Sequence, residues 1–200
     1  MNAMSTGYTA SGRTRQKERT RAQLLDAARL LIERGDTPRV EEAAEKAGIS
    51  RTTAYRYFSS QAELLAAAFP TTVARSMLPE PAPEDVRSRV GAVAASVVDH
   101  VAETESQQRA MLRLSLGDEP HELPLRQGRA IGWYMEALEP LRAELGDDDV
   151  RRLALALRSV SGIETRVWLR DVAGLDSAGV RELQLWMVEA LMDRAERSSG

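Results

Sequence analysis

The fold of this chain is decided by residues 40–58, which read VEEAAEKAGISRTTAYRYF. The first half of this stretch carries apolar residues at helical spacing and ends at Gly48, a residue typical of helix C-termini. Ser50 is a good N-cap for a second short helix, which we expect to run from Arg51 to about Phe58. Two short helices joined by a small turn that contains glycine form a helix-turn-helix.

Further helices are predicted on both sides of this motif. Residues 14–34 carry apolar side chains every three or four positions, and Gly35 follows where a C-terminal cap belongs. After the motif, Ser60 and Glu63 have the spacing of a capping box. We therefore expect a fourth helix to begin here and to run toward Ser76.

The rest of the chain also has the pattern of helices. Residues 1–12 show no apolar period and are predicted to be a disordered arm. A proline-rich stretch at residues 79–83 is the best candidate for a linker. Beyond it we predict five helices, at about residues 84–104, 105–116, 126–145, 148–170 and 177–197. Because aromatic residues make up only 4% of the chain and strand signals are missing, the sequence predicts an all-α fold.

Charge is distributed unevenly along the chain. Residues 1–60 hold 11 Arg or Lys against 7 Asp or Glu, whereas residues 61–200 hold 16 against 23. A basic N-terminal part on an acidic remainder indicates that the first part meets a polyanion such as nucleic acid. Chance clustering of charge is the alternative reading.

The helix that starts at Arg51 has a composition suited to DNA. It exposes side chains that donate hydrogen bonds, namely Arg51, Thr52, Thr53, Tyr55, Arg56 and Tyr57. Arginine can bond guanine O6 and N7 in the major groove, and threonine can bond a base edge. Tyrosine hydroxyls suit phosphates, which fix register without reading sequence. Phe58 is expected to pack on the first helix instead.

The run from Ala43 to Phe58, followed by SSQAELL at residues 59–65, resembles the TetR family of bacterial transcriptional regulators. The resemblance covers about residues 15–65, and it implies a three-helix DNA-binding domain at residues 13–60. For residues 61–200 it implies a larger helical domain that binds an effector and dimerises. It further implies a cytoplasmic homodimer, most often a repressor, that binds a palindromic double-stranded DNA operator and is released by a small molecule not yet identified.

The chain departs from the family pattern at several positions. Ala43 and Ala54 stand where larger aliphatic residues are usual, so we expect looser packing. Gln61 replaces a lysine that commonly grips phosphate, and Arg39 replaces a usual cap residue, so capping of the second helix is assigned to Thr37. Arg39 and Gln61 complete the set of residues predicted to contact DNA.

The basic residues at positions 13–21 allow two interpretations. Five of these nine residues are Arg or Lys. Such an arm could lie along phosphates or enter a minor groove. Equally, the charges could simply solvate the start of a helix.

Candidate effector and dimer residues follow from the resemblance and from local composition. Gly128 and Gly132 beside Trp133 could leave a cavity with an aromatic wall, or could allow close helix packing. The candidate effector residues are His100, Met111, Arg113, Trp133 and Tyr134. The last helix is apolar on two sides, which indicates a second packing partner. The candidate dimer residues are Leu153, Leu157, Val160, Leu183, Met187 and Leu191.

The sequence does not favour an enzyme. It has no cysteine nucleophile, P-loop, dinucleotide-binding glycine motif or zinc-binding H-E-x-x-H. We therefore predict no catalytic residue, cofactor or metal, and we interpret Asp147–Asp149 as an acidic helix start. No stretch is apolar enough to span a membrane. The alternative function is a helical small-molecule-binding or catalytic protein that no longer binds DNA.

Overall fold

The computed structural model describes residues 6–69, 76–116 and 128–197, and these residues form helices and connecting turns with no strand among them. The predicted all-α fold is confirmed. The chain divides into two compact units, residues 1–71 with 113–125 and residues 72–112 with 126–200. Among the described residues, no helix has both the length and the apolar character needed to cross a membrane.

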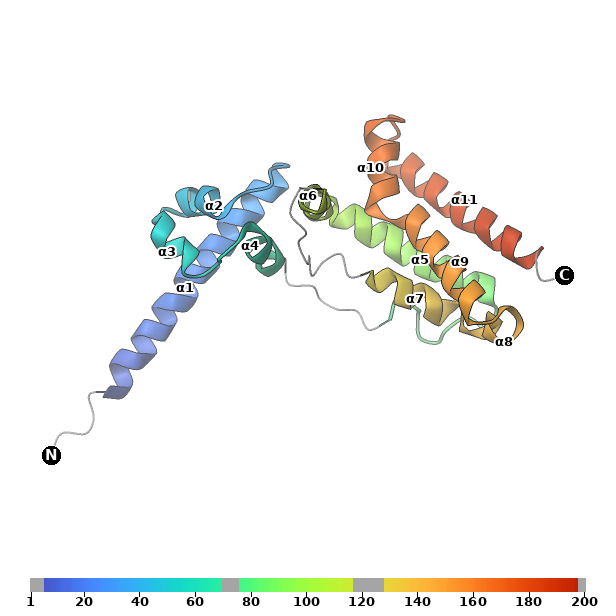
Figure 1. Ribbon diagram of the computed structural model, residues 1–200, viewed down its shortest axis with the longest axis horizontal. Helices are drawn as coiled ribbons and strands as arrows, with labels where there is room; N and C mark the ends of the chain where they lie inside the picture. The colour runs from blue at the N-terminus through green and yellow to red at the C-terminus, as the bar shows by residue number, and fades with distance from the viewer. Residues whose placement is uncertain (1–5, 70–75, 117–127, 198–200) are drawn as a thin grey trace. The chain divides into compact units, whose positions relative to one another are not determined.

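The first unit is built around four helices (Figure 1), which are α1 (Thr6–Glu33), α2 (Val40–Ala47), α3 (Arg51–Tyr55) and α4 (Gln61–Ala68). Apolar residues from all four helices share one core. Leu24 from α1 and Leu64 from α4 are fully buried, and Ala54 and Phe58 bring α3 and the turn after it into the same core. The predicted inward position of Phe58 is confirmed.

Helix α1 begins at Thr6 rather than near residue 14. Residues 6–12, which we predicted to be part of a disordered arm, are therefore helical. The physical reason is that extending an existing helix is far easier than nucleating one, and this segment holds no proline to stop it. The absence of an apolar period in the sequence bears on side-chain packing, which is a separate property from helix formation.

Two of the three predicted N-terminal helix caps are confirmed. The Ser50 hydroxyl accepts the Thr53 N–H at 3.3 Å, and the Ser60 hydroxyl accepts the Glu63 N–H at 3.1 Å. Assigning the cap of α2 to Thr37 was wrong, because the N-cap residue is Arg39. Its backbone N–H donates to a Glu42 carboxylate oxygen at 2.7 Å. The cap therefore depends on a main-chain donor and a carboxylate, whereas we expected the hydroxyl of Thr37 to accept a backbone N–H.

Helices α3 and α4 are shorter than predicted. Helix α3 ends at Tyr55 and continues into a turn, in which the N–H groups of Tyr57 and Phe58 both donate to the Ala54 carbonyl. Helix α4 ends at Ala68. The predicted continuation of α4 falls largely on residues 70–75, which lie outside the described residues.

The second unit contains α5 (Val86–Glu103), most of α6 (Glu105–Ser115), α7 (Arg129–Ala137), a 3-10 turn η2 (Glu139–Leu141), α8 (Arg142–Leu145), α9 (Asp147–Ser161), α10 (Ile163–Asp171) and α11 (Ser177–Glu196). Helices α5, α7, α9 and α11 pack on one another around a common apolar core. The acidic residues Asp147–Asp149 form the first turn of α9, as predicted.

Two helices predicted as continuous are interrupted. Residues 126–145 do not form a single helix, because Pro140 lies in η2 and has no N–H to continue the α-helical pattern. Residues 148–170 do not form one either, because α9 and α10 are separated at Gly162. The Gln184 side-chain amide donates to the carbonyls of Val160 and Gly162 at 3.0 and 3.3 Å, and the Gly162 carbonyl also accepts the Arg166 N–H at 3.2 Å.

Candidate nucleic-acid interface

Helix α3 presents one face to the core and another to solvent. Ala54 is fully buried, whereas the Arg51 side chain is 71% exposed. Thr52, Tyr55 and Arg56 are also exposed. The predicted DNA-contacting residues Thr53 and Tyr57 are half-buried. Packing therefore anchors the helix on one side and leaves hydrogen-bond donors available on the other.

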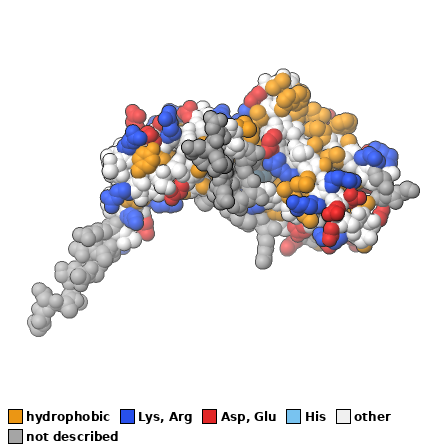
Figure 2. Space-filling model, in the orientation of Figure 1, with side chains coloured by type: hydrophobic (Ala, Val, Ile, Leu, Met, Phe, Trp, Pro, Cys, Tyr) orange, Lys and Arg blue, Asp and Glu red, His pale blue; other side chains and the backbone are white. Residues whose placement is uncertain are grey.

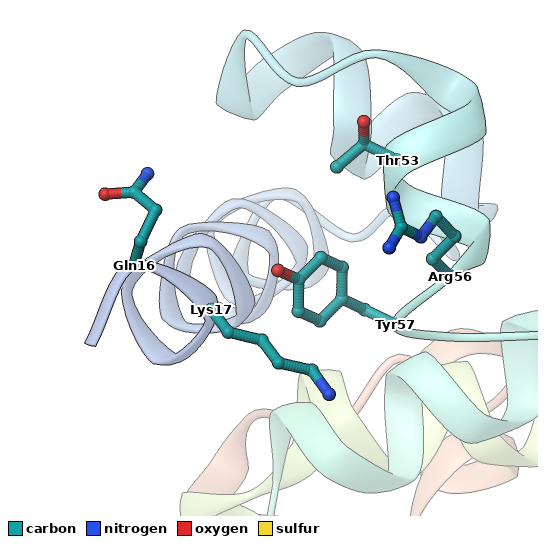
Figure 3. Close-up of a pocket in the computed structure, with 5 residues that line it drawn as sticks. All are labelled: Gln16, Lys17, Thr53, Arg56 and Tyr57. Atoms are coloured by element: carbon teal, nitrogen blue, oxygen red, sulfur yellow. The ribbon is translucent and has the colours of Figure 1, made fainter. Parts of the chain in front are cut away.

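A cleft of about 360 Å³ lies between α1 and the α3 region (Figure 3), and it is lined by Gln16, Lys17, Thr53, Arg56 and Tyr57. The Tyr57 hydroxyl points toward α1, from which Gln16 and Lys17 project. Two cations, two hydroxyls and one amide therefore surround the cleft, and the five lining residues include no carboxylate. This donor set suits an anion the size of a phosphate group.

Of the two α1 residues that line the cleft, Lys17 was singled out from the sequence but Gln16 was not. Lys17 belongs to the basic stretch for which we left two interpretations open, and its side chain lies beside the residues of the α3 region. Gln16 was not singled out, because a lone glutamine on a polar helix carries no motif. Only the length and rotation of α1 place it opposite Thr53.

A carboxylate on α2 contacts two residues of α3. Glu41 Oε1 lies 3.2 Å from Arg51 Nη2, and the Tyr55 hydroxyl donates to Glu41 Oε2 at 2.8 Å. The Arg51 guanidinium also lies over the Tyr55 ring, 5.6 Å from its centroid. Hydrogen bonding from Tyr55 lowers the pKa of Glu41, and the same bond raises the pKa of Tyr55. Sequence reasoning missed Glu41.

The two remaining candidates for DNA contact lie near the start of α2. Arg39 is exposed at the N-cap position. Gln61 donates its side-chain amide to the Thr37 carbonyl at 2.7 Å. Its amide therefore ties α4 to the turn before α2, whereas a lysine at the start of α4 would offer a charge to phosphate.

Comparison with protein-family models identifies this region. Residues 24–68 match the family described as "Bacterial regulatory proteins, tetR family". Residues 24–68 form a TetR-family domain. No curated protein and no solved structure gave a significant match. The TetR-family match supports a DNA-binding transcriptional regulator.

The candidate effector residues occupy different environments. Met111 and Tyr134 are buried, Trp133 is half-buried and His100 is exposed. The Tyr134 hydroxyl donates to the Ser161 hydroxyl at 2.8 Å, and burial raises the pKa of Tyr134 to about 12. Arg113 belongs to the first unit, where it donates to the Gly35 carbonyl at 2.6 Å.

The candidate dimer residues divide into two groups. Leu153 and Leu157 belong to the core of the second unit, and Leu157 is fully buried there. The others, Val160, Leu183, Met187 and Leu191, are half-buried. A short loop connects the end of α10 at Asp171 with Asp176, the N-cap of α11.

We predict that Lys17→Gln flattens the salt dependence of binding to duplex DNA by about 0.9 in logarithmic slope, because one ionic phosphate contact is lost. The matched control is Lys46→Gln, since Lys46 is the chain's other lysine and does not line the cleft. Fluorescence anisotropy of labelled duplex at several salt concentrations measures both slopes. Equal slopes for the two variants would show that the cleft does not hold a phosphate.

Proposed function

We propose that this protein is a homodimeric, cytoplasmic transcriptional repressor that binds a palindromic double-stranded DNA operator through α3 and is released by a small molecule. The observation that carries the proposal is the exposed donor face of α3 beside a cationic cleft, within a TetR-family domain. Arg51 is the best placed residue for reading a base, because its side chain is 71% exposed at the start of α3. Lys17, Arg56 and Tyr57 then hold the backbone phosphates beside that base.

Selection of bound sequences from random duplex DNA tests the DNA-binding part of the proposal. We expect a palindromic site, since the two-fold symmetry of a dimer is matched by two half-sites about one helical turn, ~34 Å, or a multiple apart. Arg51→Ala is expected to weaken binding to the selected site by about 1–3 kcal/mol and to relax preference at one base pair in each half-site.

Two outcomes would contradict this assignment. Equal weakening on all sequences would place Arg51 on phosphate. A folded wild-type protein without salt-dependent DNA binding would favour the alternative of a helical small-molecule-binding or catalytic protein that no longer binds DNA.

The proposed dimer surface lies on α10 and α11, where hydrophobic side chains gather on the face seen in Figure 2. Trp168 on α10 is 57% exposed and Trp186 on α11 is 62% exposed. Leu183, Trp186 and Met187 fall on one side of α11, because residues three and four positions apart are neighbours on a helix. Tryptophan side chains with so large an exposed fraction are typical of surfaces that another protein covers.

We predict that replacing Leu183 and Met187 together by glutamate converts the dimer to folded monomer or prevents folding. The reason is that two-fold symmetry would bury each new charge close to its own copy. Leu30→Glu is the control, because Leu30 is an exposed leucine of the first unit. Sedimentation velocity gives the mass, and an intact dimer in the double variant would refute this surface.

The last turn of α6, from Arg113, belongs to the first unit. Arg113 bonds the Gly35 carbonyl and, at 3.1 Å, the Thr37 hydroxyl, in the turn that leads to α2. Within the first unit, these contacts help to hold the start of the helix-turn-helix.

We predict that a small, largely apolar molecule binds the second unit near Trp133 and weakens operator binding by ~1–3 kcal/mol. Quenching of tryptophan fluorescence detects binding, and Trp133→Phe identifies the reporting residue. Thermodynamic linkage requires the operator to weaken effector binding by the same factor. Equal effector affinities with and without the operator would refute the coupling while leaving DNA binding intact.

A further inference from the structure

Glu41 holds Arg51 on one side and leaves it free on the other. The carboxylate uses one oxygen for Arg51 Nη2 and the other for the Tyr55 hydroxyl. The Tyr55 ring supports the guanidinium from its face. Arginine has five N–H donors, and the contact with Glu41 lies at Nη2, so most of the 71% exposed side chain stays available to DNA.

We infer that Glu41 is a specificity-determining positioning residue, which directs Arg51 toward a base edge and withholds Arg51 and Tyr55 from indiscriminate contact with phosphate. This inference rests on the proposed function of α3. It concerns a residue on α2 that acts through Arg51 and does not itself read the operator.

Arg51 meets different hydrogen-bond acceptors on non-specific DNA and at a specific site. On non-specific DNA the strongest acceptors are phosphates, and the negative charge of Glu41 repels a phosphate that approaches the same guanidinium. At a specific site, guanine O6 and N7 need two N–H groups along one edge of the guanidinium. Nη2 carries two hydrogens, so Arg51 can bond guanine while one hydrogen stays with Glu41. The carboxylate therefore opposes phosphate capture and is compatible with base reading.

Tyr55 is restrained in the same way. Its hydroxyl donates its single hydrogen to Glu41, so it cannot donate to a phosphate until that bond breaks. Removing the carboxylate charge would free both side chains together. We therefore expect non-specific binding to gain more than specific binding.

The test uses Glu41→Gln, with Glu45→Gln as the matched control. Glu45 is exposed on the same helix, and its loss removes the same charge while leaving both Glu41 contacts in place. Binding is measured on a random-sequence duplex and on the selected duplex at several salt concentrations. Glu41→Gln should raise affinity for the random duplex about two- to tenfold more than Glu45→Gln does, because the ion pair with Arg51 is lost and the acceptor of the Tyr55 hydroxyl becomes neutral.

Two further readouts separate positioning from a general charge effect. The salt slope on random duplex should steepen by up to about 0.9 in Glu41→Gln, since Arg51 becomes free to take a phosphate. Base preference at the position read by Arg51 should fall in Glu41→Gln. In the Arg51→Ala background, the same substitution should leave base preference unchanged, because the residue through which Glu41 acts is gone.

The contact itself is checked without DNA. Carbon-13 NMR titration of the tyrosine rings should show the pKa of Tyr55 falling toward its ordinary value in Glu41→Gln, and circular dichroism should show an unchanged helix content. Glu41→Gln behaving like Glu45→Gln on both duplexes would overturn the inference, as would an equal effect in the Arg51→Ala background. A wild-type protein without salt-dependent DNA binding would overturn the proposed function, and this inference with it.

Discussion

Burial of Ala54 and Phe58 is the constraint on which the whole candidate DNA-binding surface depends. Helix α3 has only five residues, and a helix of that length has no stability of its own in water. Its position comes from Ala54 and Phe58, which lie almost completely inside the core of the first unit, and from the Ser50 cap at its start. Exposed residues such as Arg51 inherit their geometry from these buried neighbours.

This core is held by small residues. Ala43 and Ala54 are fully buried at positions where the family commonly has larger aliphatic residues. Each alanine buries about three fewer carbons than leucine, which is about 2 kcal/mol less hydrophobic stabilisation. Polar contacts between helices and turns therefore contribute a larger share of the stability of the first unit. Examples are the hydrogen bond from the Gln61 amide to the Thr37 carbonyl and the one from the Arg29 guanidinium to the Ala68 carbonyl at 2.6 Å.

The features that could be predicted from the sequence are those determined by residues close together in the chain. The helix-turn-helix, the Ser50 and Ser60 caps and the buried position of Phe58 each depend on residues within a few positions of one another. At the break between α9 and α10, by contrast, the Val160 carbonyl accepts a hydrogen bond from Gln184, which is 24 positions away. No local pattern contains that information.

The same reasoning applies to the candidate DNA interface. Exposure of the α3 residues followed from helical periodicity, but their partners did not. Glu41 meets Tyr55 across 14 positions, and Gln16 meets the α3 region only because α1 extends far enough and with the right rotation. Such contacts depend on how helices pack, and they decide whether an exposed arginine is restrained or free.

Packing within a single chain explains only part of the sequence of helix α11. Its buried residues Val180, Val188 and Met192 follow one stripe, and ion pairs from Arg87 to Asp193 and from Arg181 to Asp99 fasten the helix to α5. Trp186 lies off this stripe and is mostly exposed. Packing within the chain therefore accounts for the buried stripe of α11 and for Leu185 and Leu191, which pack against the same core. The Trp186 side chain contributes little to the fold of a single chain, and its position is explained if a second copy of the chain covers it.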